Sequence, residues 1–362
     1  MLKLEKTNVI DKEYWNIVKG IGIILVVIGH LCWDLTRYIY LFHLPLFFFV
    51  SGYLYNEDKY GDDPYLHVAN RLKSSWMKYV LVFWVLIWTH NLWLDLKIAW
   101  VYPGYYDITD IAGEMVQALL GQGGESFGIT LWFVPVSVIS TCLLGFIVTF
   151  SRKVYTFTNS LLAKYGMQFI IVLGCTILGY YLEKKQVYLA AESQVSLVVM
   201  PFLWIAYLLR NVRLDIKPYL NIVGAILCGV LVYAASGEYK LDLAMKWVYP
   251  YMHIVAFMGI YMCLYLAKMI QKVSGLNKCI AAYGKASFWI MFAHLPLCRI
   301  FDWIYINLNF PERFEELYYV IDTVIFPDKF WPVYLLIGLG LTFFIYIGYE
   351  EIKDKLKKLV RA

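Results

Sequence analysis

The sequence predicts an all-α integral membrane protein, a polytopic bundle of about ten transmembrane helices with both termini in the cytoplasm. Of its 362 residues, 61% are hydrophobic and only 16% are charged, whereas soluble domains carry about 25% charged residues. Stretches long enough to cross roughly 30 Å of hydrocarbon recur along the whole chain. A water-soluble core cannot bury this much apolar surface. The net charge of +5 is not evidence for nucleic-acid binding, because the charges follow the topology.

Ten apolar stretches are long enough to be the predicted spans. The first is expected to stay in the protein, because its N-terminal flank is polar and no small-residue cleavage site follows it. The sixth is interrupted by Pro201 near its start, where a helix is expected to break. The stretches are 17–35, 38–55, 76–94, 130–150, 167–183, 195–209, 218–235, 248–270, 286–306 and 330–350.

The loop charges support this topology. Arg and Lys are concentrated in every second loop and in both terminal segments, and cytoplasmic loops carry such an excess. The predicted cytoplasmic cations include Lys59, Arg71, Lys73, Lys78, Arg152, Lys153, Lys164, Arg210, Arg213, Lys268, Lys272 and Lys285. The opposite loops contain few cations and many acids, so the sequence places both termini inside.

The whole chain, 1–362, reads as one membrane-embedded domain. Its seven cysteines are scattered and lack paired spacing, so we expect neither a disulfide framework nor a metal site. Two loops, 95–129 and 307–328, are longer than a simple connection requires. Long loops are often functional, and both are predicted outside, where a large acceptor would approach.

The stretch from Trp15 to Tyr55 contains the first candidate site residues. His30 lies within the first apolar span, and an ionisable side chain at membrane depth indicates function. Asp34 follows four residues later, on the same face of a continuous helix. The carboxylate would then orient the imidazole as a general base. The alternative is that Asp34 lies at the interface and His30 bonds to neighbouring backbone.

His43 begins the second candidate segment, Phe42-His43-Leu44-Pro45. A proline suits a helix start, which places His43 at the outer mouth of the second span, as a site residue or as an interfacial histidine. The small pair Ser51-Gly52, deeper in the same span, favours close helix packing over a catalytic role for Ser51.

These residues, from Lys19-Gly20 to Gly29-His30 and from Phe42-His43-Leu44-Pro45 to Ser51-Gly52-Tyr53, resemble the N-terminal signature of the membrane acyltransferase-3 family. Two later segments are similar in the same order: Leu131-Trp132-Phe133-Val134-Pro135, and Gly284-Lys285-Ala286-Ser287-Phe288-Trp289-Ile290 with His294. Asn16 departs from the pattern, because many members carry an acid there.

The resemblance implies an O-acyltransferase of the bacterial cytoplasmic membrane, a multi-pass protein. It would move an acetyl group from cytoplasmic acetyl-CoA to a hydroxyl of an extracytoplasmic polysaccharide or lipid-linked sugar. His30 matches the essential histidine of the family, and His43 matches its Phe-His-x-Pro histidine. Such transfer needs a base for the hydroxyl proton and donors for the oxyanion. Trp132 and the groups around Ser51 are candidate donors.

Coenzyme A carries phosphates, so its site is expected to use inner-face cations. The candidates are Lys19, Arg71, Lys73, Arg210 and Arg213, although topology alone also explains such cations. His294 is expected near mid-membrane, as a site or packing residue. Arg299 lies inside a predicted span, where it is expected to pair with Asp302 or line a cavity.

Two other classes of function stay open at this point. A polysaccharide or small-molecule transporter also uses intramembrane charges and broken helices, but no inverted repeat is detectable. Loss of all acylation in a folded His30→Ala variant would separate an enzyme from a transporter. For a membrane sensor or assembly partner, no feature argues positively. The sequence decides neither the acceptor nor the acyl group, and it leaves a homo-oligomer open.

Overall fold

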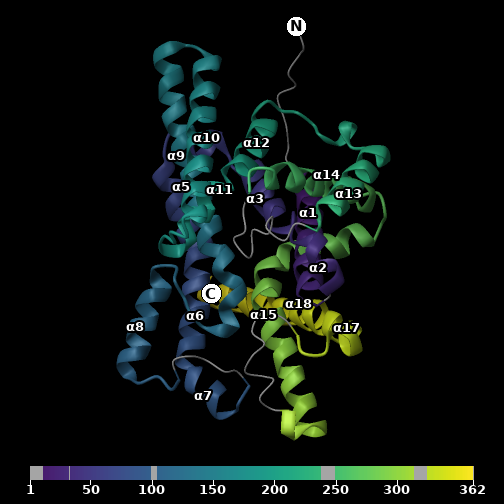
Figure 1. Cartoon of the computed structure of the whole chain (residues 1–362). Coiled ribbons are helices and arrows are strands. Elements are labelled where there is room, and N and C mark those ends of the chain that lie inside the picture. Colours follow the sequence, from purple (N-terminus) through teal and green to yellow (C-terminus); the bar gives the residue numbers. More distant parts are fainter. Residues whose placement is uncertain (1–10, 32, 99–103, 238–248, 314–323, 362) are drawn as a thin grey trace.

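The computed structural model describes residues 11–31, 33–98, 104–237, 249–313 and 324–361. These residues form α-helices, short 3-10 and π-helical turns and loops, and no strand occurs among them. Figure 1 shows the helices arranged around α1 and α15, with the α9–α10 hairpin along one side. The predicted all-α architecture is confirmed for this part of the chain.

The first half of the chain contains α1 (Lys12–Leu31), α2 (Trp33–Ile39), α3 (His43–Leu54), α4 (Glu57–Tyr60), α5 (Pro64–Arg71), the π-helical turn η1 (Leu72–Trp76), α6 (Met77–Trp88), α7 (His90–Asp95), α8 (Ile108–Leu119), the 3-10 turn η2 (Ser126–Trp132) and α9 (Phe133–Thr158). The second half contains α10 (Leu161–Lys184), η3 (Ala190–Glu192), α11 (Ser193–Val198), α12 (Met200–Asn211), η4 (Lys217–Tyr219), α13 (Ile222–Ala235), α14 (Met252–Ile270), α15 (Leu276–Asn309), η6 (Pro311–Arg313), α17 (Pro327–Leu335), the π-helical turn η7 (Leu336–Leu341) and α18 (Thr342–Arg361).

Several of these helices are long and apolar enough to cross a membrane. Within the described ranges, five helical segments are long and apolar enough: Lys12–Leu31, Ser126–Thr158, Leu161–Lys184, Met252–Ile270 and Pro327–Lys355. The pair Ala190–Val198 and Met200–Asn211 makes a sixth if its halves form one span bent by 57°. Pro201 lies in the first turn of α12, so the break occurs where the sequence predicts it. The chain is a multi-pass membrane protein, and the count of ten spans stays a prediction.

Two glycines bring α1 and α15 into backbone contact. A Cβ added at Gly20 would lie 2.0 Å from the Ile280 carbonyl oxygen, and one added at Gly284 would lie 1.9 Å from the Asn16 carbonyl oxygen. Along the same pair of helices Glu13 bonds to Asn277 and His30 lies beside His294, so residue numbers rise together and the two helices run parallel. Because only glycine permits this approach, the pair fixes the register of α15 against α1.

A third glycine packs α3 against α12. A Cβ added at Gly52 would lie 2.1 Å from the Leu203 carbonyl oxygen, while the Ser51 hydroxyl donates to the Phe47 carbonyl oxygen at 2.8 Å. The prediction that Ser51-Gly52 marks close helix packing is therefore confirmed.

The first predicted external loop contains structure of its own. Helix α8 begins at a capping box in which the Asp107 and Asp110 side chains each accept from the backbone of the other residue. His90 Nε2 donates to the Gly104 carbonyl oxygen at 2.8 Å, and His90 Nδ1 lies 3.1 Å from the Glu125 carboxyl group. Much of this predicted loop is thus folded, with a helix of its own and hydrogen bonds that fix it. Residues 99–103 of it, residues 314–323 of the second loop and the terminal residues 1–10 lie outside the described residues.

Candidate active site

Three histidines and one tyrosine gather where α1, α3 and α15 meet. The ring centroids of His30 and His294 are 5.2 Å apart. The Tyr40 hydroxyl lies 3.3 Å from His30 Nδ1, and the Tyr40 and His43 rings are 4.8 Å apart. We call His30, Tyr40, His43 and His294 the histidine cluster. The sequence predicted His30 and His43 as site residues, and the structure places them in one cluster with His294.

The helix packing explains why these side chains meet. Helix α3 returns antiparallel to α1, so a residue at its first position, His43, faces the last turn of α1. Helix α15 runs parallel to α1 from the Gly20–Gly284 contact. His30 is ten residues beyond Gly20, and His294 is ten residues beyond Gly284. Equal steps along two parallel helices bring the two rings to the same level.

Backbone carbonyl oxygens fix two of the histidines. His294 Nδ1 donates to the Ile290 carbonyl oxygen at 2.9 Å, and His43 Nδ1 donates to the Ile39 carbonyl oxygen at 2.9 Å. A carbonyl oxygen only accepts, so a neutral ring carries its proton on Nδ1 and a lone pair on Nε2. His294 Nε2 is buried and without a partner. This lone pair is a proton acceptor beside His30.

His30 Nδ1 contacts a side-chain hydroxyl, whereas His43 Nδ1 and His294 Nδ1 contact backbone carbonyl oxygens. The partner of His30 Nδ1, the Tyr40 hydroxyl, can either donate or accept a hydrogen bond. His30 can therefore change tautomer without losing this contact. A histidine that takes up and releases a proton during a reaction needs such freedom.

The role of Asp34 as the orienting group of His30 stays a prediction. Asp34 lies in the first turn of α2, beyond Leu31, the last described residue of α1. Its side chain is exposed, whereas Tyr40 contacts His30 from the turn before α3. Sequence reasoning missed Tyr40, although its place three residues before His43 was a usable signal.

Ser51 and Trp132, the other candidate hydrogen-bond donors to the oxyanion, make contacts within the helical core. The Ser51 hydroxyl is bonded within α3, and Trp132 ends η2 and packs against the core formed by α3, α9 and α12. Neither contact brings these groups into the histidine cluster.

Lys19 and Lys285 form a cationic pair at the opposite end of α1 and α15. Lys19 is half-buried and Lys285 is exposed, and Lys285 is the charge that acts on Lys19. No ion pair of the described residues includes either lysine. Since α-helices rise 1.5 Å per residue, Lys19 lies about 16 Å along the axis from His30. The two helices thus carry a lysine pair and a histidine pair at two levels.

The other predicted cofactor-binding cations are distributed differently. Arg71 is half-buried, donates to the Ser137 hydroxyl at 3.4 Å and has a buried Nε without a partner. Lys73 is exposed on η1. Arg210 donates to the Tyr53 and Tyr55 carbonyl oxygens at 3.1 and 2.6 Å, so its contacts here cap the C-terminus of α3. Arg71 keeps free hydrogen-bonding capacity for a ligand.

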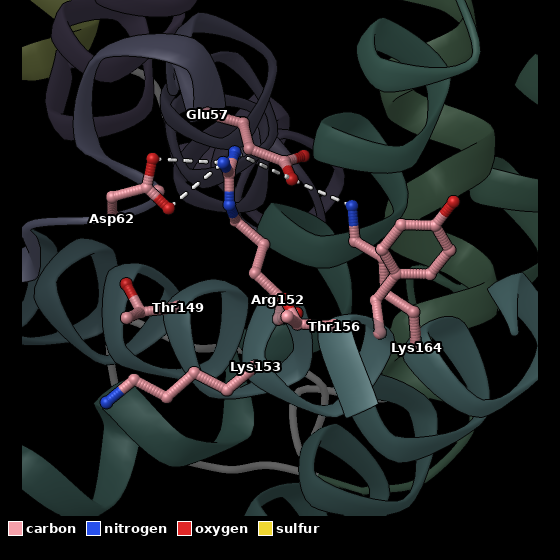
Figure 2. A pocket seen from close by; sticks show the side chains of 9 residues that line it. Glu57, Asp62, Thr149, Arg152, Lys153, Thr156 and Lys164 are labelled. Carbon is pink, nitrogen blue, oxygen red and sulfur yellow. Dashed lines mark hydrogen bonds and ion pairs between the residues drawn. The ribbon is translucent and has the colours of Figure 1, made fainter. Parts of the chain in front are cut away.

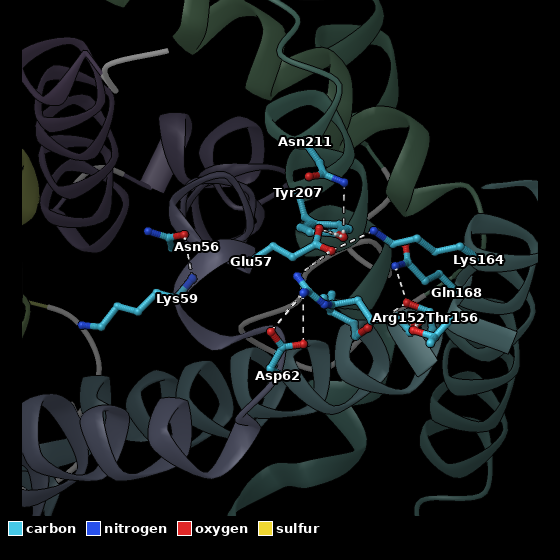
Figure 3. A network of polar contacts seen from close by, with 12 residues as sticks. Asn56, Glu57, Lys59, Asp62, Arg152, Thr156, Lys164, Gln168, Tyr207 and Asn211 are labelled. Atoms are coloured by element: carbon cyan, nitrogen blue, oxygen red, sulfur yellow. Dashed lines mark hydrogen bonds and ion pairs between the residues drawn. The ribbon is translucent and has the colours of Figure 1, made fainter. Parts of the chain in front are cut away.

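A polar cavity of about 450 Å³ lies between α4 and the α9–α10 hairpin. Figure 2 shows Arg152, Lys153 and Lys164 among the lining side chains. Glu57 accepts from Lys164 Nζ at 2.7 Å, and Arg152 pairs with Asp62 at 3.0 Å. Figure 3 shows Glu57 at the centre of this network, where Tyr207 also donates to it at 2.5 Å. Because their charges are already paired, Arg152 and Lys164 hold α4 to the hairpin.

Of the two expectations for Arg299, pairing with Asp302 or lining a cavity, the structure shows no direct ion pair with Asp302, although the Asp302 charge acts on Arg299. The two oxygens of Asp302 accept from the Tyr334 hydroxyl and from the Ile325 backbone N–H. No ion pair of the described residues includes Arg299.

Comparison with known proteins identifies the family. A family model described as "Acyltransferase domain" matches residues 12–350. The chain belongs to the acyltransferase-3 family. The chain is also 31% identical over 160 residues to the nodulation protein NolL of Mesorhizobium japonicum (strain LMG 29417 / CECT 9101 / MAFF 303099). That match covers 40% of this chain and 38% of NolL. No solved structure matches the chain significantly. The resemblance predicted from the sequence motifs is confirmed.

Proposed function

We propose that this protein is an O-acyltransferase of the bacterial cytoplasmic membrane. In this proposal it moves an acetyl group from cytoplasmic acetyl-CoA to a hydroxyl of an extracytoplasmic polysaccharide or lipid-linked sugar. Membership of an acyltransferase family supports the reaction class. The observation that carries the proposal is the 5.2 Å approach of His30 and His294, because acyl transfer to a hydroxyl requires a positioned base.

His30 is the proposed general base. It removes the proton of the acceptor hydroxyl as the oxygen attacks the thioester carbonyl carbon. The tetrahedral intermediate then collapses, the carbon–sulfur bond breaks, and the thiolate of coenzyme A takes up a proton as it leaves. Tyr40 is the proposed orienting partner of His30 Nδ1, since the two atoms lie 3.3 Å apart.

Acetyl-CoA fits the distribution of charge along α1 and α15. Lys19 and Lys285 offer two unpaired ammonium groups for its phosphates. The axial distance of about 16 Å from Lys19 to His30 is on the scale of an extended pantetheine arm. Arg71, with its unpartnered Nε, is a third candidate for binding the donor. We propose that the donor lies along these two helices, with its acetyl group at the histidine cluster.

The test uses purified protein in detergent and radiolabelled acetyl-CoA. The wild type is expected to release labelled acetate slowly, or to label an added glycan acceptor. His30→Ala is expected to lower either rate by about 10²–10⁴-fold while the protein keeps its thermal stability and its affinity for acetyl-CoA. Equal rates in the two proteins would exclude His30 as the base. Folded wild type that neither binds nor turns over acetyl-CoA would exclude this donor and favour the transporter.

A further inference from the structure

Arg299 is a buried cation without a direct ion-pair partner among the described residues. It lies within α15, is 9% exposed, and its Nη1 atom is shielded from solvent and has no hydrogen-bond partner. Burying a guanidinium is strongly unfavourable unless hydrogen bonds and an opposite charge compensate it. An unsatisfied buried polar group in a folded protein calls for an explanation, and a ligand that binds there is one.

The nearest acid along the helix is used for another purpose. Asp302 is 1% exposed and accepts from the Tyr334 hydroxyl and from the Ile325 N–H at 3.3 Å. Both oxygens therefore hold the segment that leads into α17. The negative charge of Asp302 acts favourably on Arg299. Asp302 does not supply a hydrogen-bond acceptor for Arg299 Nη1, which has no partner.

The position of Arg299 along α15 indicates which molecule would bind to it. Lys285, His294 and Arg299 follow one another along the helix, so Arg299 lies beyond the histidine cluster on the side away from the lysine pair. Arg299 is five positions beyond His294, which corresponds to about 7.5 Å along the axis. If the donor phosphates bind at the lysine pair, Arg299 is on the acceptor side of the cluster.

We propose that Arg299 binds an anionic oxygen group, phosphate or carboxylate, on the sugar acceptor. A planar guanidinium binds either group through two parallel hydrogen bonds. The acceptor is then an acidic molecule, with its anionic group about 7 to 8 Å along α15 from the reacting hydroxyl. That the bound molecule is the acceptor rests on the proposed function, whereas the anion site itself does not.

A stability measurement separates a ligand-binding arginine from a structural one. Arg299→Met removes the charge and keeps most of the volume. If the charge is uncompensated, this variant is expected to melt about 2 °C or more above the wild type in detergent. Lys329→Met is the matched control, because Lys329 is an exposed cation that donates to the Tyr305 hydroxyl at 2.7 Å. A lower melting temperature for Arg299→Met would show a structural role and overturn the proposal.

Anion binding is measured on the same proteins. Sodium pyrophosphate and sodium glucuronate are titrated separately, with sodium chloride at equal ionic strength as the reference. At least one of the two is expected to raise the melting temperature of the wild type and of Lys329→Met, but not of Arg299→Met. An effect of pyrophosphate alone indicates a phosphate-bearing acceptor, and an effect of glucuronate alone indicates a carboxylate. No effect on the wild type, or an equal effect on Arg299→Met, would exclude the site.

Failure of this proposal is distinguishable from failure of the proposed function. Arg299→Met is expected to keep the slow hydrolysis of acetyl-CoA while it loses the response to anions. His30→Ala is expected to lose hydrolysis and keep the response to anions. Loss of hydrolysis in both variants would place Arg299 in the donor half of the site and contradict an acceptor role.

Discussion

The imidazole rings of His30 and His294 lie 5.2 Å apart although they come from the first and the fifteenth helix. Each ring is ten residues beyond a glycine, Gly20 or Gly284, at which the two parallel helices touch. The geometry of the candidate active site is therefore set about 15 Å away from it along the helix axes. A change at the glycine contact is therefore expected to move the two histidines relative to each other.

Tyr40 is expected to matter more than Asp34 for the reactivity of His30. Tyr40→Phe removes a hydroxyl that lies 3.3 Å from His30 Nδ1, and one hydrogen bond of this kind contributes about 1 kcal/mol. We expect a five- to tenfold lower rate of acetyl transfer. Asp34→Asn, at an exposed position in α2, is expected to leave the rate unchanged. The opposite ranking in a radiolabel assay would restore Asp34 as the orienting group.

Gly284→Ala is expected to destabilise the protein and to separate the two histidines. The new Cβ would lie 1.9 Å from the Asn16 carbonyl oxygen, so the helices must move apart, at a cost of about 1–3 kcal/mol or more. Gly166→Ala in α10 is the control, because nothing lies within 4 Å of its Cβ. That variant is expected to be neutral or up to about 1 kcal/mol more stable. Thermal melts in detergent compare the two, and equal melting temperatures would contradict the close contact.

Lys19→Met is expected to weaken donor binding without slowing chemistry. A charged hydrogen bond to phosphate contributes about 1.5–3 kcal/mol, so the KM for acetyl-CoA should rise roughly 10- to 100-fold while kcat changes little. Lys285→Met should act in the same direction, and less strongly because Lys285 is exposed. Lys272→Met removes an exposed cation away from this pair and is the control. Unchanged KM values in both variants would move the phosphate site elsewhere, with Arg71 as the next candidate.

Asp11 is expected to make stability depend on acid pH. Its carboxylate accepts from Lys217 Nζ at 2.6 Å and from the Gln271 amide at 2.7 Å. Burial acts to raise the pKa of Asp11, but the hydrogen bonds from Gln271 and Lys217 outweigh it and hold the pKa below its ordinary value of 3.8. A depressed pKa stabilises the fold above the unfolded value, and this stabilisation is lost as pH falls through the folded value.

The comparison is between wild type and Asp11→Asn in detergent melts from pH 7 to pH 3. The wild type is expected to be more stable near neutral pH, by about 1 kcal/mol or less because the pair is partly exposed. The difference should shrink as the pH falls below the ordinary pKa of 3.8. Asp58→Asn, at an exposed acid, corrects for the loss of one negative charge. A stability difference that does not change with pH would contradict the assignment.

The sequence was sufficient for the elements with strong local signals. Apolar length and low charge predicted the helical membrane architecture, Pro201 predicted the break between α11 and α12, and the Ser51-Gly52 pair predicted a close helix contact. Each of these follows from the chemistry of one or two residues and requires no knowledge of distant partners.

The contacts of the candidate site depend on partners that the sequence does not place. Asp34 was placed beside His30 by its spacing, whereas in the fold Asp34 is exposed and Tyr40 contacts His30. Tyr40 is one of 31 tyrosines, and only the antiparallel return of α3 distinguishes it. Arg299 was paired with Asp302 by sequence spacing, but Tyr334 and Ile325 bind that carboxylate in the fold.

The pairing of α1 with α15 has a consequence for biogenesis. Asn277 donates to Glu13 across 264 positions of sequence, so α1 leaves the ribosome long before its main partner exists. At about 5–20 residues per second, translation of the intervening chain takes roughly 13 to 53 s. During that interval the Gly20 contact surface of α1 lacks its α15 partner. The insertion machinery or another helix has to shield it, and a chain truncated before α15 would be inserted without an active site.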